Sequence, residues 1–356
     1  MLVFSAVMTG LSASLVDMAA EFGVATTRAG VFYSLHFVGF VALIALSLAV
    51  RGIRGRLILT VTTAAVYAIA LIVAGVSPGL TVVLAALFVA GGSGGILESH
   101  TSTMQVMTTG SEGEAGAYVS MTQVFFALGA LLAPIYLALR GGGADWRGLF
   151  LLLAVLSMVA FGTGLLVRTS RFPVVRGENQ PMHLPSLARV SLGLVFYVGA
   201  EITLFGWIPT VMEVYRHVPA ARARLAPSIF WLGMLAGRVV VARLSGRVAP
   251  RRLLRVSAIL GVVSAVGLSL VAAEPLLWLM VVLVSLACAG IWPLLVATSG
   301  SAGHETATTI AIAAGGVGGA IFPYIAGLSA EILPGNFIPI VAAPLFLLVI
   351  LLSGGE

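Results

Sequence analysis

The 356-residue chain is too apolar for a soluble protein, because hydrophobic residues make up 60% of it and charged residues only 9%. Soluble domains are about one quarter charged. The formal net charge is +6, and all 19 basic residues are arginine. Anionic lipid headgroups are a sufficient partner for this positive charge, so no nucleic-acid partner is expected. The composition excludes a soluble enzyme and predicts an integral membrane protein.

Apolar stretches long enough to cross a bilayer follow one another along the whole chain. A hydrocarbon core about 30 Å thick requires about 20 apolar residues per helical span. The first stretch lacks a basic leading region, so we interpret it as a span and not as a signal peptide. We expect an all-α membrane fold of twelve transmembrane helices, over residues 1–18, 29–50, 57–76, 79–107, 116–139, 148–167, 188–212, 226–246, 252–272, 275–298, 306–330 and 336–353.

The second half of the sequence repeats features of the first half. The segments GVFYSLHFVG and SIFWLGMLAG have two aromatic residues and a glycine at the same spacing, with Gly39 and Gly237 offset by 198 residues. The segments GALLAP and GGAIFP end at Pro134 and Pro323. Chance similarity between apolar helices is the competing explanation, but the matches keep their order and nearly one offset. Internal repeats are typical of secondary transporters.

The repeat predicts two pseudo-symmetric six-helix bundles, residues 1–167 and 188–356. The hydrophilic segment 168–187, rich in proline and charge, predicts a linker between them. If both chain ends and this linker are cytoplasmic, twelve arginines lie at the inner side and six at the outer side. The positive-inside rule favours that orientation. We therefore expect a multi-pass protein of a bacterial plasma membrane, with the lipid bilayer as its surroundings.

Three charged residues fall well inside predicted spans, away from the span ends: Glu98 in the fourth, Glu201 in the seventh and Arg238 in the eighth. A charge at the bilayer centre costs at least about 2.5–3.5 kcal/mol, so such groups usually face a cavity or a partner. Burial disfavours the charged form of a carboxyl group, which allows it to take up and release protons near neutral pH. Glu98 and Glu201 are the candidate proton-coupling residues. Glu201 and Arg238 form a structural ion pair in the alternative interpretation.

The fourth predicted span, AGGSGGILESHTSTMQ, combines a glycine run with polar residues. Glu98, Ser102 and Gln105 lie at positions i, i+4 and i+7, which places them on one helical face. This polar stripe predicts the lining of a cavity, although Glu98 could instead be a structural group bonded to a neighbouring helix. Trp207 and Trp292 could stack on a sugar ring or another flat ligand, or could serve as packing residues or interfacial anchors.

Taken together, these motifs resemble the major facilitator superfamily, and in particular its branch that is similar to fucose–proton symporters. The resemblance covers nearly the whole chain and rests on GGSGGILE, QVFFALGALLAP, YVGAEITLFGWIP, FWLGMLAGR with the basic loop ARLSGRVAPRR, and GGVGGAIFPYIAG. It implies alternating access by rocking of two six-helix bundles. It also implies that helices 1, 4, 7 and 10 line a central cavity.

The chain departs from the sugar-transporting pattern of that branch. Ser102 and Phe126 stand where the resemblance implies sugar-contacting asparagines, and Ala13 stands where it implies an aspartate, whereas Gln123 is retained. Glu98 would then be the main matching proton site. The candidate substrate-binding residues are His100, Ser102, Gln105, Gln123, Phe126, Trp207 and Trp292.

We therefore expect a monomeric secondary active transporter that moves a small polar solute, such as a sugar, with a proton or sodium ion. The alternative is proton-driven efflux of an amphipathic compound, which the apolar Phe126 and Ala13 favour. An enzyme is not expected, because the five histidines are scattered and Cys288 is the single cysteine; no metal or cofactor is predicted. ATP-driven pumping lacks its GxxxxGK[ST] motif. A non-transporting sensor or assembly factor would tolerate a neutral Glu98.

Overall fold

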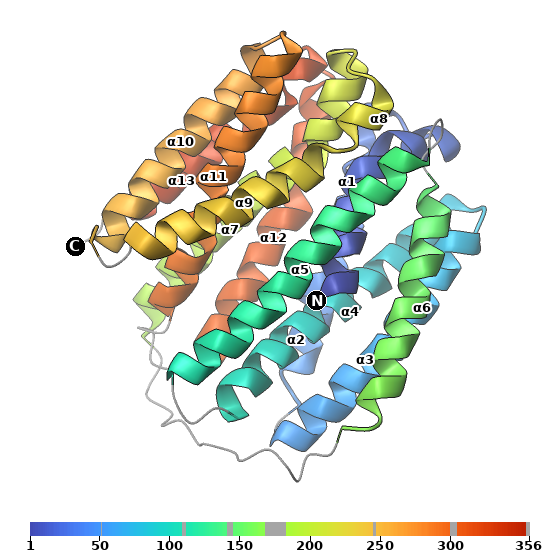
Figure 1. Ribbon diagram of the computed structural model, residues 1–356, viewed down its shortest axis with the longest axis vertical. Coiled ribbons are helices and arrows are strands. Elements are labelled where there is room, and N and C mark those ends of the chain that lie inside the picture. Colours follow the sequence, from blue (N-terminus) through green and yellow to red (C-terminus); the bar gives the residue numbers. More distant parts are fainter. Residues whose placement is uncertain are drawn as a thin grey trace.

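The computed structural model describes residues 1–50, 52–108, 112–140, 145–167, 183–244, 247–299 and 305–353. Within these ranges it describes no side chains at 102–103, 105–108, 112–121, 123, 297–299, 305–306 and 308. The described chain is helical, and Figure 1 shows its two bundles side by side, the first coloured blue to green and the second yellow to red.

The first bundle contains α1 (Leu2–Glu21), α2 (Val31–Ser47), α3 (Gly52–Val76), α4 (Leu80–Thr108), α5 (Glu112–Leu139) and α6 (Trp146–Gly164). The second contains α7 (Leu184–Thr210) with a π-helical turn (Val211–Tyr215), α8 (Ala220–Ala223), α9 (Ala226–Leu244), α10 (Pro250–Leu270), α11 (Glu274–Ser299), α12 (Glu305–Ser329), and a 3-10 segment (Gly335–Val341) that leads into α13 (Ala342–Leu352).

These helices account for twelve membrane crossings. Among the described residues, 11 helical segments are long and apolar enough to span a membrane, and α8 with α9 forms one of them. Helix α5 supplies the twelfth crossing: its 28 residues extend about 42 Å at 1.5 Å per residue. The predicted all-α fold with two six-helix bundles is therefore confirmed. The boundaries 168–187 of the linker stay a prediction, and α7 itself begins at Leu184, with His183 as its N-cap.

The two bundles repeat the same close helix contacts. Gly39 of α2 lies against the backbone of Phe88 in α4, and Gly237 of α9 lies against Leu286 and Ala289 in α11. Small residues allow helix backbones to approach closely in a membrane. The glycines recognised in the sequence repeat therefore serve as equivalent contact points in the two bundles.

A second pair of contacts involves the other repeated segment, GALLAP in the first half of the chain and GGAIFP in the second. Gly129 of α5 faces the carbonyl oxygen of Leu2 in α1, and Gly318 of α12 faces the carbonyl oxygen of Val195 in α7. Helices α1, α2, α4 and α5 thus correspond to α7, α9, α11 and α12. This correspondence positions eight helices around the interface between the bundles.

Replacing Gly91 of α4 by alanine should destabilise the first bundle. A methyl group at this position would overlap the carbonyl oxygen of His36 in α2, and backbone cannot rotate away as a side chain can. Overpacking of this kind costs about 1–3 kcal/mol. We expect Gly91→Ala to lower the Tm of the purified protein in detergent. Gly162→Ala in α6 is the matched control, because nothing lies within 4 Å of its added methyl group. Equal Tm values for the two variants would contradict the assigned α2–α4 contact.

Candidate functional site

A central cavity lies between the two bundles and has an empty volume of about 680 Å³, including its open part. Its lining comes from α1, α2, α4 and α5 of the first bundle and from α7, α9, α11 and α12 of the second. The cavity therefore involves twice as many helices as the four that the resemblance implied.

The three charged residues predicted inside the spans all line this cavity: Glu98 from α4, Glu201 from α7 and Arg238 from α9. The positive charge of the Met1 ammonium group acts on Glu98, and that of Arg238 acts on both carboxyl groups. The structure thus adds Glu98 to the neighbours of Arg238, which the sequence had considered only as a partner of Glu201. One carboxyl group comes from each bundle, so both bundles contribute to one electrostatic unit.

Glu201 is tied to its surroundings by an aromatic hydroxyl group. Tyr197, one turn earlier on α7, has its hydroxyl group within hydrogen-bonding reach of the Glu201 carboxyl group. The same hydroxyl group donates a hydrogen bond of 2.9 Å to the carbonyl oxygen of Cys288 in α11. Both Glu201 and Tyr197 are buried. Glu201 therefore lies beside the α7–α11 contact as well as facing the cavity.

The remaining wall of the cavity is mainly aromatic. The rings of Phe126 and Trp231, from different bundles, lie with their centroids 4.9 Å apart. The Phe4 ring lies 6.0 Å from Phe126 and 5.9 Å from Phe40. Phe37 and Trp292 complete the set of six aromatic lining residues. A ligand in this cavity would meet ring faces on several sides and charged groups at a few positions.

The predicted site residues divide into three groups. Phe126 and Trp292 line the cavity together with Glu98, Glu201 and Arg238. His100 is buried in α4 and is not among the lining residues. Ser102, Gln105 and Gln123 lie outside the residues whose side chains the structure describes.

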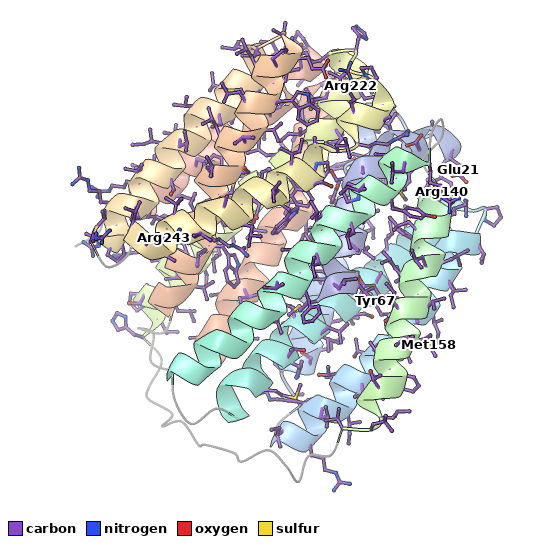
Figure 2. The ribbon with its side chains drawn as sticks, in the orientation of Figure 1. Glu21, Tyr67, Arg140, Met158, Arg222 and Arg243 are labelled. Carbon is purple, nitrogen blue, oxygen red and sulfur yellow. The ribbon has the colours of Figure 1, made fainter. Side chains whose placement is uncertain are left out.

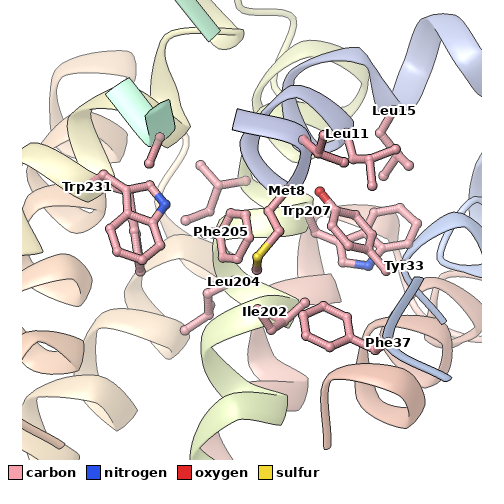
Figure 3. Packing of buried hydrophobic residues seen from close by; sticks show 14 of the residues in the cluster. Met8, Leu11, Leu15, Tyr33, Phe37, Ile202, Leu204, Phe205, Trp207 and Trp231 are labelled. Atoms are coloured by element: carbon pink, nitrogen blue, oxygen red, sulfur yellow. The ribbon is translucent and has the colours of Figure 1, made fainter. Parts of the chain in front are cut away.

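Trp207 belongs to the packing between helices and not to the cavity lining. Its indole N–H donates a hydrogen bond of 2.8 Å to the carbonyl oxygen of Pro323 in α12, and the side chain is fully buried. Figure 3 shows it beside Tyr33 in the hydrophobic cluster. Of the two alternatives that the sequence left open for Trp207, the structure therefore favours packing.

Four aromatic lining residues were missed in the sequence: Phe4, Phe37, Phe40 and Trp231. Tyr33, Phe37 and Phe40 have the same i, i+4, i+7 spacing that pointed to the polar stripe on α4, so a signal was present. Aromatic residues are also common in helix packing, however, so the spacing alone did not distinguish a cavity from a core. Among the described residues, no cluster of three or more His, Cys, Asp or Glu side chains could hold a metal ion.

One end of the interface between the bundles is sealed by ion pairs. The Nη2 atom of Arg224, at the end of α8, lies 3.0 Å and 2.9 Å from the two carboxylate oxygens of Asp17 in α1. The Arg224 side chain is only 3% exposed. Arg28 and Glu331 form a second pair at 3.3 Å, with exposures of 63% and 43%. Figure 2 shows Glu21 and Arg222 at this end of the molecule.

In the region between these ion pairs and the central cavity, serine side chains form hydrogen bonds from one bundle to the other. Ser12 donates to the carbonyl oxygen of Phe205 at 2.6 Å, and Ser34 donates to that of Ala320 at 2.6 Å. Ser228 donates to the carbonyl oxygen of Leu131 at 2.8 Å. These hydrogen bonds and ion pairs between the bundles lie on one side of the cavity. We refer to this side as the sealed end.

Asp17→Asn should destabilise the protein more than the loss of the exposed pair at the same end. Removing one partner of a buried ion pair typically costs about 3–5 kcal/mol, whereas exposed pairs contribute about 0–1 kcal/mol. We expect a clear decrease in Tm for Asp17→Asn and little change for Glu331→Gln, measured in the same detergent. Equal decreases would show that Asp17 and Arg224 do not contribute as a buried pair.

Comparison with known proteins places this arrangement among membrane transporters. The model of the Major Facilitator Superfamily matches residues 1–323. No curated protein matches the chain in sequence. Its structure is similar to that of the xylose transporter XylE from E. coli in a partially occluded inward-open conformation, with a TM-score of 0.78, 13% identity, and coverage of 98% of this chain and 95% of that chain.

Two further solved structures are also similar. The transporter FucP in its outward conformation has a TM-score of 0.68 at 15% identity, over 99% of this chain and 97% of that chain; FucP is the E. coli fucose:proton symporter. The human organic anion transporter TETRAN has a TM-score of 0.68 at 18% identity, over 99% and 98% of the two chains. At these identities the similarity establishes the fold.

Proposed function

Because the chain belongs to the major facilitator superfamily, we propose that this membrane transporter carries a small polar solute, such as a sugar, by proton-coupled alternating access. One observation carries the proposal: a carboxyl group from each bundle and an arginine face one cavity at the interface between the bundles. Secondary transporters of this architecture bind their substrate near the bilayer midplane between the repeats.

The charged groups of the cavity are suited to coupling with protons. A buried carboxylate is costly unless it is paired or neutralised by a proton. Arg238 can offset one negative charge, but Glu98 and Glu201 together carry two. Loading or losing one proton therefore changes the net charge of the closed cavity by one unit. Glu98 is the proposed principal proton carrier, since Glu201 is also bound into the α7–α11 contact through Tyr197.

A sugar fits the chemistry of the lining. The apolar face of a sugar ring can stack on Trp231 or Trp292, and its hydroxyl groups can bond to carboxyl and guanidinium groups. Structural neighbours include a fucose:proton symporter and a xylose transporter. Ser102, Gln105 and Gln123 remain proposed ligands on the helices that line the cavity.

The sealed end gives the proposed direction of access. In the orientation that the arginine distribution predicts, the chain ends and linker are cytoplasmic and the sealed end faces outward. The cavity would then be open to the cytoplasm in a plasma membrane. Substrate exchange with the outside requires the Asp17–Arg224 pair and the serine hydrogen bonds to separate.

Glu98→Gln should abolish uphill transport while allowing exchange. The amide resembles the permanently protonated carboxyl group, so the carrier can still rock but cannot release a proton. The measurement is transport of an identified substrate in proteoliposomes, with and without a pH gradient. Glu331→Gln, which changes an exposed glutamate at the sealed end, is the matched control and should retain gradient-driven accumulation.

The companion variant Glu201→Gln separates coupling from structure. We expect a smaller effect on coupling and a larger decrease in Tm, because Glu201 contacts Tyr197 and interacts with Arg238. Full gradient-driven accumulation by Glu98→Gln would assign the coupling to another residue, with Glu201 as the next candidate.

A second candidate function is proton-driven efflux of an amphipathic compound. The specific observation in its favour is the aromatic wall, including Phe126 at a position where the resemblance implied asparagine. Apolar pockets with few polar groups bind flat hydrophobic ligands well. A transporter of organic anions is also among the structural neighbours.

Trp292→Ala should distinguish a ligand-contacting tryptophan from a packing tryptophan. A thermal-shift screen with sugars and amphipathic compounds identifies the ligand, because a compound that binds only the folded state raises the Tm. We expect Trp292→Ala to reduce this ligand-induced shift with a small change in the ligand-free Tm. Trp207→Ala should lower the ligand-free Tm, since large-to-small changes in a core cost about 3–5 kcal/mol. The reverse pattern would exclude Trp292 from the binding site.

A further inference from the structure

A second cavity lies inside the second bundle, at the end opposite to the sealed end. It has an empty volume of about 880 Å³, including its open part. The first turns of α7 and α10 and the last turns of α11 and α13 surround it. It shares no lining residue with the central cavity, so its role is independent of the proposed transport site.

The described lining of this second cavity has a polar part and an apolar part. The polar part contains Arg189 of α7 and Arg251 of α10, together with Ser186 and Ser353. The apolar part contains Val190, Pro250, Leu254, Leu294, Leu295 and Leu352. No carboxylate is among the described lining residues. The cavity therefore combines two positive charges with an aliphatic surface.

The two arginines are suited to binding a phosphate group. A guanidinium group has five N–H donors in a planar fork, so it can hold a phosphate and still contact its own chain. Arg189 and Arg251 are exposed residues on different helices. Arg251 lies in the first turn of α10, where the helix dipole also favours negative charge, and Arg189 lies in the second turn of α7. A phosphate between them would be attracted from two sides.

The aliphatic surface distinguishes a lipid from a free anion. A phosphate ion alone would leave Leu254, Leu295 and Leu352 without an apolar ligand against them. The cavity also lies at the ends of α7, α10, α11 and α13, and the ends of membrane-spanning helices lie near the lipid headgroups. We propose that this cavity binds an anionic phospholipid, with its phosphate between Arg189 and Arg251 and its glycerol and acyl portion against the leucines.

Other arginines at this end of the second bundle provide a control for the non-specific attraction of anionic lipids to basic residues. Arg243 of α9 and Arg255 of α10 are exposed and do not line the cavity. Figure 2 labels Arg243, which lies in the last turn of α9. Basic residues near a membrane surface attract anionic lipids without a specific site. Replacing these two arginines changes the net charge by the same amount as replacing the two in the cavity.

The test measures the Tm of the full chain in a non-ionic detergent with added phosphatidylglycerol, phosphatidylcholine or glycerol phosphate. We expect phosphatidylglycerol to raise the Tm by a few degrees, because it binds the folded state, and the other two compounds to raise it less. Arg189→Gln with Arg251→Gln should remove most of this increase. Arg243→Gln with Arg255→Gln should retain it.

A variant that keeps every charge tests the proposal when the arginine double variants do not fold. Leu352→Trp narrows the apolar part of the cavity and should also reduce the response to phosphatidylglycerol. An unchanged response in Leu352→Trp, or equal losses in the two double variants, would overturn the proposal in favour of diffuse surface attraction. A response to glycerol phosphate as large as that to phosphatidylglycerol would overturn it in favour of a free-anion site.

Discussion

Hydrocarbon offers no hydrogen-bond partner, and this constraint decides where the polar groups of the chain lie. It requires helices, which satisfy their backbone groups internally. It explains why Ser12 and Ser34 donate to backbone carbonyl groups across the interface between the bundles, and why the buried Arg224 contacts Asp17 through both carboxylate oxygens. The charged groups left within the spans, Glu98, Glu201 and Arg238, lie where the bundles enclose a cavity.

Contacts within a bundle differ in kind from contacts between the bundles. Within a bundle, glycines such as Gly39 and Gly318 bring backbones together, and separating or sliding these helices would lose dense packing. Between the bundles, hydroxyl groups and ion pairs at the sealed end can exchange their partners for water one by one. The interface can therefore open while each bundle moves as a unit, which is the mechanical requirement of alternating access.

The sequence predicted the helices and the charged part of the candidate site well, because both follow from the cost of placing polar groups in hydrocarbon. It predicted the aromatic part poorly. Trp207 and Trp231 both lie in apolar helices, yet one packs against α12 and the other lines the cavity. The Asp17–Arg224 pair could not be predicted from the sequence. Each residue lies near a helix end, where charges are ordinarily solvated, and only the relative position of the two bundles buries them.

The internal symmetry of the structure is broken at the charged residues of the cavity. The offset of 198 residues that relates Gly39 to Gly237 also relates Phe40 to Arg238, and both of these line the cavity. The equivalent contacts of Leu2 and Val195 give an offset of 193, which relates Met8 to Glu201, again two lining residues. A symmetric scaffold makes two related conformations accessible, with the cavity open to either side. Because Arg238 and Glu201 have apolar counterparts in the first bundle, the two conformations surround these charges differently. Their relative free energies can therefore depend on whether a proton is bound, which is the thermodynamic condition for coupling.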